Sequence, residues 1–160
     1  MDRATFNELG GGIVGNLLSL EFLMRFLLVQ TESPIEPMPV FDELKAGDHV
    51  AEGTFTNYES LGDVIARTNA YLEAHGIGER VDPSIVGIRD ALAHGRKVFA
   101  DKNGPATLVK FGRPRHGTVL VQAVFTLTED ELRLLTERIY GEIKKVIAAG
   151  QALNPAAFAD

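Results

Sequence analysis

The spacing of apolar residues along the chain predicts four helices. Between Ile13 and Val29 apolar side chains occupy most of the helical circumference, which is typical of a central helix or of one covered by a second subunit. The segments 57–75, 82–94 and 128–149 instead repeat apolar residues at intervals of three and four, as on one face of a helix. Their apolar stripes are Leu61, Ile65, Thr68 and Leu72; Ile85, Ile88 and Leu92; and Leu132, Leu135, Ile139, Ile143 and Val146.

The helix ends are predicted from residues that can satisfy free backbone groups. Thr5 with Glu8, and Thr128 with Glu131, match the Ser/Thr-x-x-Glu capping box, in which two side chains and two backbone amides bond reciprocally. A glycine just after an apolar stripe commonly ends a helix because it has no Cβ. The predicted starts are Thr5, Asn57, Asp82 and Thr128, and the predicted stops are Gly76 with Gly78, Gly95 and Gly150.

Between the last two helices the apolar period changes to that of a β-strand. Residues 107–111 and 118–127 have strand composition, and the second segment alternates between apolar and other residues. Its residues predicted on one side are Val119, Val121, Ala123, Phe125 and Leu127. Residues 101–105 and 112–117 contain the glycines, prolines and polar residues of turns. These patterns predict a mainly α-helical bundle with a small antiparallel sheet of two or three strands inserted before the last helix.

The length and composition fit one domain. The chain has 160 residues, of which 45% are hydrophobic, enough for a core without disulfides or structural metals. We expect a single helical domain over residues 1–150 and a frayed tail over residues 151–160. The segment 31–56 is a long acidic connector with three prolines, and loops of this length are usually functional or mobile. It contains no catalytic motif.

The chain contains no cysteine, which excludes disulfides, thiol nucleophiles and cysteine-ligated metals and suits a reducing cytoplasm. We expect no signal peptide, because Asp2 and Glu8 precede the first apolar run. The run 13–29 is short for a membrane span, and it contains Glu21 and Arg25, which are four residues apart and can pair. We therefore expect a core helix in a cytoplasmic protein.

The net charge of −6 is unevenly distributed along the chain. Between Arg89 and His116 there are seven basic and two acidic residues, so this segment carries +5 and the remainder −11. A basic patch on an acidic protein predicts a local anion-binding surface, the alternative being chance clustering on an ordinary surface. Phe99 and Phe111 could stack on bases, although core packing is the simpler interpretation. The candidates for contacts with a nucleic-acid backbone are Arg96, Lys97, Arg113 and Arg115.

The predicted helix 82–94 carries an arginine, a carboxylate and an imidazole near its C-terminal end. Asp90 and His94 are four residues apart and share a helix face, and Arg89 projects about 100° away from Asp90. Imidazole exchanges protons near neutral pH, and arginine can hold two phosphate oxygens. The three are candidate catalytic residues for RNA cleavage, with Asp90 orienting the imidazole. The simpler alternative is a surface ion pair between Arg89 and Asp90, with His94 at the negative end of the helix dipole.

The segment IRDALAHGRKVF, residues 88–99, resembles the HEPN family, the higher eukaryotes and prokaryotes nucleotide-binding domains. The family signature is an arginine, then a polar residue, then a histidine after four to six intervening positions, late in a helical bundle. Arg89, Asp90 and His94 match it with four residues between arginine and histidine. The HGR triplet at 94–96, the LVKFGRP segment at 108–114 and the TxxE cap of the last helix are similar to a bacterial branch of the family, so the resemblance covers about half of the chain.

The resemblance implies an RNA-binding homodimer that cleaves RNA with Arg89 and His94 in a cleft lined by both motifs. Many members are metal-independent endoribonucleases, often toxins or antiviral effectors, and a toxin implies an antitoxin partner. No histidine has the HxxxH or HExxH spacing, so we expect no metal or other cofactor. Asp90 stands where the family most often has asparagine, which favours a non-catalytic interaction or nucleotide-binding module as the alternative. A third alternative is a helical partner protein whose apolar first helix serves assembly.

Overall fold

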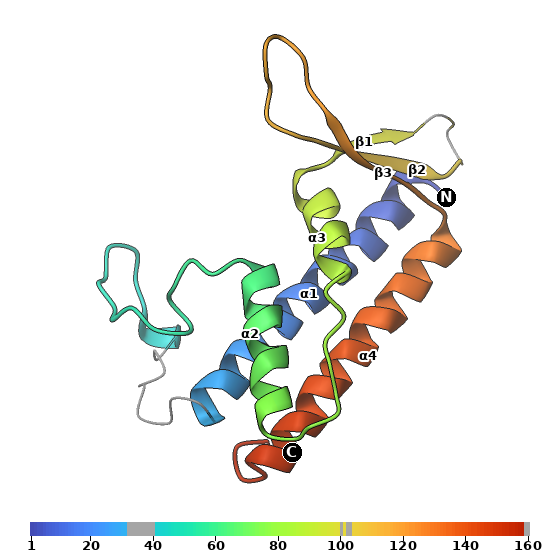
Figure 1. The fold of residues 1–160 in the computed structure, drawn as a ribbon. Helices are drawn as coiled ribbons and strands as arrows, with labels where there is room; N and C mark the ends of the chain where they lie inside the picture. Colours follow the sequence, from blue (N-terminus) through green and yellow to red (C-terminus); the bar gives the residue numbers. More distant parts are fainter. Residues whose placement is uncertain (32–40, 100, 102–103, 159–160) are drawn as a thin grey trace. The chain divides into compact units, whose positions relative to one another are not determined.

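The structure is a computed structural model that describes residues 1–31, 41–99, 101 and 104–158. Within them lie four α-helices and an antiparallel sheet of three strands, which confirms the predicted mainly α-helical fold with a sheet before the last helix (Figure 1). The helices are α1 (Arg3–Thr31), α2 (Leu61–Ala74), α3 (Ile85–His94) and α4 (Glu129–Leu153), with a short 3-10 helix η1 (Phe41–Glu43). The strands are β1 (Arg96–Phe99), β2 (Ala106–Phe111) and β3 (Val121–Leu127). The prolines of the long connector lie outside the described residues.

Backbone contacts group the chain into two compact units, each built from separate segments. Unit 1 comprises Met1–Leu18 and Ser84–Gly141, and unit 2 comprises Ser19–Pro83 and Glu142–Asp160. Each of the long helices α1 and α4 therefore has one part in unit 1 and another part in unit 2. The single domain over residues 1–150 stays a prediction.

In unit 2, α2 begins later than predicted because Ser60, and not Asn57, caps it. The Ser60 hydroxyl accepts a bond from the Asp63 N–H at 3.3 Å, and the Asp63 carboxylate accepts one from the Ser60 N–H at 3.1 Å. This reciprocal pair is a capping box. The residues buried in unit 2 include Leu61, Val64, Ile65, Thr68 and Leu72 of α2; Leu20, Met24, Leu27 and Leu28 of α1; and Ile143, Val146 and Ala149 of α4. The predicted apolar stripe of α2 is thus confirmed.

Gly150 does not end α4, contrary to the prediction, but makes room for an aromatic ring. The helix continues to Leu153, and the Asn154 N–H donates to the Gly150 carbonyl at 2.8 Å. Phe158 is buried, with its ring centroid 5.1 Å from that of Phe26. A Cβ at Gly150 would lie 2.6 Å from Phe158 Cγ. The prediction of a frayed tail is therefore wrong for residues 151–158, and residues 159–160 lie outside the described part.

Replacing Gly150 by alanine is expected to destabilise the protein by about 1 kcal/mol or more, because the new Cβ overlaps the Phe158 ring. Gly141→Ala is the matched control, since Gly141 lies in the same helix with nothing within 4 Å of a Cβ. Alanine there is expected to stabilise the protein by up to about 1 kcal/mol through helix propensity. Urea denaturation of both variants measures the difference. Equal stabilisation by both would contradict the contact between Gly150 and Phe158.

In unit 1 one face of the sheet packs on helices. Both outer strands pair antiparallel with β2, which gives the order β1-β2-β3. On the inner face of β2, Ala106 and Leu108 are buried and the strand contacts α3. On β1 the Phe99 ring meets the Phe6 ring of α1 edge to face, with centroids 5.6 Å apart. The interpretation of Phe99 as a packing residue is confirmed.

Three helices begin in unit 1, and the sequence predicts their starts unequally well. The helix α3 begins at Ile85, after Ser84, and not at the predicted Asp82. The predicted capping box of α4 is present, with the Thr128 N–H donating to the Glu131 carboxylate at 2.7 Å and the Glu131 N–H to the Thr128 hydroxyl at 3.2 Å. At α1 the cap is Asp2, whose carboxylate accepts a bond from the Thr5 N–H at 2.8 Å. The prediction that Thr5 opens this helix is therefore wrong, because an earlier residue supplies the acceptor.

A β-bulge turns part of β3 to the other face of the sheet. Lys110 pairs with Ala123 and Phe111 pairs with Val121, so that Gln122 is an extra residue in β3. Val121 therefore shares the outer face with Phe111, and its predicted place beside Ala123 is wrong. Phe111 and Val121 are 47% and 49% exposed. Phe111 is consequently available to a ligand and is not a core residue.

Among the described residues, α1 is the one helix long and apolar enough to cross a membrane. Core helices of soluble proteins and signal sequences share that length and composition, so this is weak support for a membrane span. Within unit 2, Arg25 of α1 is buried and bonded to protein groups, as in a core helix.

Candidate functional site

The predicted Arg–Asp–His motif lies at the C-terminal end of α3, in unit 1. The helix is anchored by Ile85 and Ala91, which are fully buried. It ends at Gly95, whose N–H donates to the Ala91 carbonyl at 2.8 Å, so the predicted stop is confirmed. Arg89 and Asp90 are half-buried and His94 is exposed on the last turn.

Asp90 is neutralised by two cations from different elements. One carboxylate oxygen accepts a bond from Arg89 Nη1 at 3.2 Å, and the other accepts one from Lys110 Nζ of β2 at 2.8 Å. Partial burial by itself raises the pKa of Asp90, but hydrogen bonds and charge from Lys110 and then Arg89 outweigh it and lower the pKa. Asp90 is therefore ionised at neutral pH, and the three side chains together carry +1.

Within the described residues, no hydrogen bond joins Asp90 to His94, although they are four residues apart on one helix. Both Asp90 oxygens are instead bonded to Arg89 and Lys110. The expectation that Asp90 orients the imidazole is not met in this arrangement. The exposed His94 ring lies on the last turn of α3.

The structure divides the predicted phosphate-binding residues among three places. Arg96 and Lys97 lie on opposite faces of β1, because neighbouring residues of a strand alternate. Lys97 donates to the Asn7 side chain at 3.0 Å and lies 5.1 Å from the Phe6 ring centroid, so α1 already contacts its ammonium group. Arg96 is exposed on the outer face of the sheet.

Arg113 and Arg115 are exposed in the hairpin between β2 and β3. The hairpin closes through two backbone hydrogen bonds between Arg115 and Thr118, of 2.8 and 3.0 Å. His116 and Gly117 between them have positive φ values of 50° and 78°, as in a type I′ turn. The predicted turn is present, and its two arginines extend the basic surface away from α3.

Lys110 is the site residue that sequence reasoning missed. The signal lies in the alternation of β2, because Ala106, Leu108 and Lys110 share one face and the first two are buried. A lysine third in that row is expected to need an acidic partner on the element packed against β2. Asp90 of α3 is that partner.

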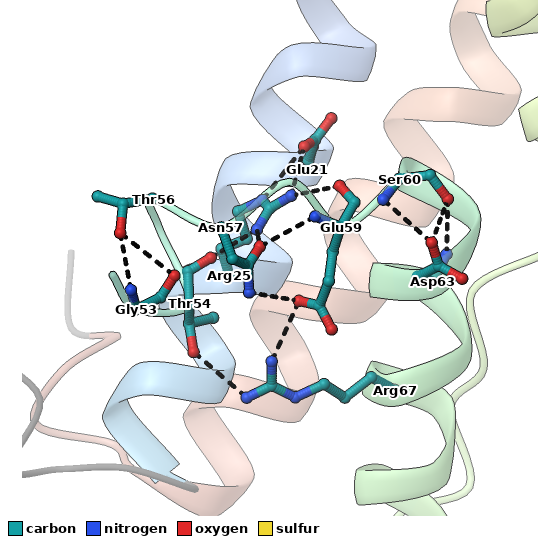
Figure 2. A network of polar contacts seen from close by, with 10 residues as sticks. All are labelled: Glu21, Arg25, Gly53, Thr54, Thr56, Asn57, Glu59, Ser60, Asp63 and Arg67. Atoms are coloured by element: carbon teal, nitrogen blue, oxygen red, sulfur yellow. Dashed lines mark hydrogen bonds and ion pairs between the residues drawn. The ribbon is translucent and has the colours of Figure 1, made fainter. Parts of the chain in front are cut away.

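A second polar cluster lies in unit 2 and is centred on the buried Arg25, which is 6% exposed (Figure 2). Its guanidinium donates to the Glu21 carboxylate at 3.0 and 3.1 Å, as predicted from their spacing. It also donates to the Thr54 carbonyl at 2.5 Å, the Asn57 side chain at 2.8 Å and the Glu59 carbonyl at 2.9 Å. All five N–H groups of the guanidinium are therefore used.

This second cluster fastens the end of the long connector to two helices. Glu59 accepts bonds from Asn57 at 2.8 Å and from Arg67 of α2 at 3.2 Å. Arg67 also donates to the Thr54 hydroxyl at 3.2 Å. Because every N–H of the Arg25 guanidinium is bonded to protein groups, we interpret the cluster as structural.

Comparison with known proteins finds no matching family model, no matching curated protein and no matching solved structure. The resemblance to the HEPN family therefore stays a prediction from the sequence of α3 and its surroundings. Within the part of the chain that the structure describes, no three His, Asp or Glu side chains gather where they could hold a metal ion. The chemistry available at the end of α3 is that of Arg89, Asp90, His94 and Lys110 themselves.

Proposed function

We propose that this chain is a HEPN-like RNA-binding protein that cleaves RNA without a metal ion, using Arg89 and His94 in the cleft of a homodimer. The observation that carries the proposal is the end of α3, where the exposed His94 follows Arg89 and Asp90 on one helix, and Lys110 of β2 joins these two in a cluster of net charge +1. The carboxylate of Asp90, unfavourable beside a phosphate, is offset there by both Arg89 and Lys110.

The proposed reaction moves one proton at each end of the scissile phosphate. Neutral His94 takes the proton of the ribose 2′-hydroxyl, whose oxygen attacks the neighbouring phosphorus. The bond from phosphorus to the 5′-oxygen breaks, and protonated His94 of the partner subunit gives its proton to the leaving oxygen. Arg89 contacts the non-bridging oxygens and stabilises their developing charge. The products are a cyclic phosphate and a free 5′-hydroxyl.

The hairpin between β2 and β3, together with Arg96 on the outer face of the sheet, is proposed to bind the RNA backbone. Arg96, Arg113 and Arg115 are exposed there, and Phe111 offers a ring for base stacking. Lys97 is left out of this surface, because Asn7 and Phe6 contact its ammonium group. We place the protein in the cytoplasm, and a toxin role would add an antitoxin as partner.

The second candidate is a non-catalytic HEPN-type module that binds RNA or a nucleotide. The ion pair between Arg89 and Asp90 favours it, because a guanidinium held by a carboxylate must be released before it can grip a phosphate. Both candidates bind RNA, and only the first cleaves it.

RNA affinity is expected to depend on salt through the hairpin. The plot of log affinity against log salt has a negative slope. In the double variant Arg113→Ala with Arg115→Ala, this slope is expected to be shallower by about 1.4, the contribution of two phosphate contacts on a single strand. Fluorescence anisotropy with a labelled single-stranded RNA, between about 50 and 200 mM salt, measures the slope. Lys45→Ala with Lys144→Ala removes the same charge from exposed positions of unit 2 and is the control. Equal slopes for the two double variants would contradict binding by the hairpin.

A further inference from the structure

The two edges of the sheet in unit 1 differ in how well they are protected from pairing with another strand. β1 has four residues, and two of them, Arg96 and Lys97, are cations of the kind that blunt an edge. β3 has seven residues, VQAVFTL, without a charge, a proline or a glycine. Among the described residues it pairs with β2 along one side only, and its other side forms an edge of the sheet. An uncharged edge of this length is a template for strand addition.

An apolar groove accompanies this edge on the inner face. It has a volume of about 440 Å³ and lies between β3, α3 and α4. Phe125 and Leu127 of β3, Ile88 of α3, and Leu134 of α4 line it. Leu134 is 64% exposed although it lies on the groove. A strand added to β3 would place its inward side chains over these residues.

We infer that β3 of a second copy of this chain adds to the free edge of β3, antiparallel and centred on Val124, to form a continuous sheet of six strands. In this register Val124 lies opposite itself on the outer face, and Gln122 lies opposite Thr126, so a polar residue meets a polar one. On the inner face Ala123 lies opposite Phe125 of the partner subunit, a small residue beside a large one. The pattern of β3 is therefore complementary to itself, as an interface with two-fold symmetry requires.

The charges that flank β3 favour the same antiparallel pairing. The hairpin before β3 carries Arg113 and Arg115, and the first turn of α4 after it carries Glu129, Asp130 and Glu131 (Figure 1). An antiparallel partner brings its acidic end beside the basic end of the first copy, and the two-fold axis repeats the contact. A parallel partner would bring like charges together. The complementarity identifies a second copy of the chain as the occupant of the edge.

A single cysteine tests this register, because the chain has no cysteine of its own. Residues directly opposite in an antiparallel pair have Cα atoms about 4.5–5.5 Å apart, within the range of a disulfide. Val124→Cys is therefore expected to form a disulfide-linked dimer under mild oxidation. Val98→Cys is the matched control, because Val98 is similarly exposed, 52% against 57%, but lies on the opposite edge strand. Both variants are oxidised at low protein concentration, and non-reducing electrophoresis then distinguishes a disulfide-linked dimer, expected for Val124→Cys, from the monomer expected for Val98→Cys.

Analytical ultracentrifugation of proteins without an introduced cysteine measures the dimer dissociation constant and gives a second, independent test. The unsubstituted protein is expected to be a dimer, and Val124→Lys is expected to raise its dissociation constant about tenfold or more, whereas Val98→Lys leaves it unchanged. Circular dichroism checks that the variants are folded. A monomeric unsubstituted protein, or equal cross-linking by Val124→Cys and Val98→Cys, would overturn the inference. Comparison of Val124→Cys with Val98→Cys tests the pairing of β3 without RNA, so it can fail while RNA cleavage by His94 persists. A monomeric protein would contradict both this inference and the homodimer of the proposed function.

Discussion

RNA cleavage in the presence of EDTA is expected to fall by about 10²- to 10⁴-fold when His94 is replaced by alanine, the usual contribution of a general acid or base. His94 is exposed at the end of α3, so its removal leaves the core unchanged. RNA binding measured by anisotropy is expected to stay within about twofold, because the imidazole contributes to proton transfer more than to phosphate affinity. The measurement is the rate of product formation from a mixed RNA at fixed protein concentration.

Two matched variants make this cleavage result specific. His49→Ala removes another exposed imidazole, from the connector of unit 2, and is expected to leave the cleavage rate unchanged. Asp90→Asn restores the amide that the resemblance associates with this position and frees Arg89 and Lys110 from the carboxylate. It is expected to retain cleavage and to bind RNA about threefold more tightly, from the loss of one nearby negative charge. Cleavage that persists in His94→Ala would exclude His94 as the catalytic residue, and no cleavage by any form would favour the non-catalytic module.

The free energy of unfolding is expected to fall by about 3–5 kcal/mol in Arg25→Ala, the range found when one partner of a buried ion pair is removed. The substitution leaves the Glu21 carboxylate and the Thr54 and Glu59 carbonyls without the donors that satisfy them. An unsatisfied buried polar group costs stability because it has lost water without gaining a protein partner. Urea denaturation followed by circular dichroism measures the loss.

The chain supplies its own control for this stability prediction. Glu129 and Arg133 of α4 have the same spacing as Glu21 and Arg25 and are joined at 2.7 Å, but their side chains are 42% and 60% exposed. Arg133→Ala is expected to leave the free energy of unfolding nearly unchanged, because solvent screens exposed ion pairs on helices. If Arg25→Ala and Arg133→Ala lower the free energy of unfolding by similar amounts, the contacts of Arg25 with the connector do not contribute to stability.

This comparison also shows how far local sequence could predict the structure. Both pairs follow from four-residue spacing, and the pairing of Glu21 with Arg25 was predicted correctly. The acceptors at Thr54, Asn57 and Glu59 lie about thirty residues further along the chain, and no periodicity connects them to Arg25. Their position depends on how the connector folds back on α1, which is a tertiary property.

The candidate site shows the same division between local and tertiary information. The placement of Arg89, Asp90 and His94 near the end of one helix follows from apolar spacing and from Gly95. The bond from Lys110 to Asp90 depends on which face of β2 meets α3, and it redirects the carboxylate away from His94. The bulge at Gln122 is a third case, because one extra residue reverses the face of Val121 without changing the alternation of the sequence.

The division of α1 between the two units has a consequence for synthesis on the ribosome. The first 18 residues belong to one unit with residues 84–141, and Phe6, Ile13 and Leu17 among them are buried in the folded chain. At a synthesis rate of about 5–20 residues per second, about 6–25 seconds pass between synthesis of residue 18 and of residue 141. For that time these apolar side chains lack the later segment of their unit. During that interval the growing polypeptide is a natural client for a holding chaperone.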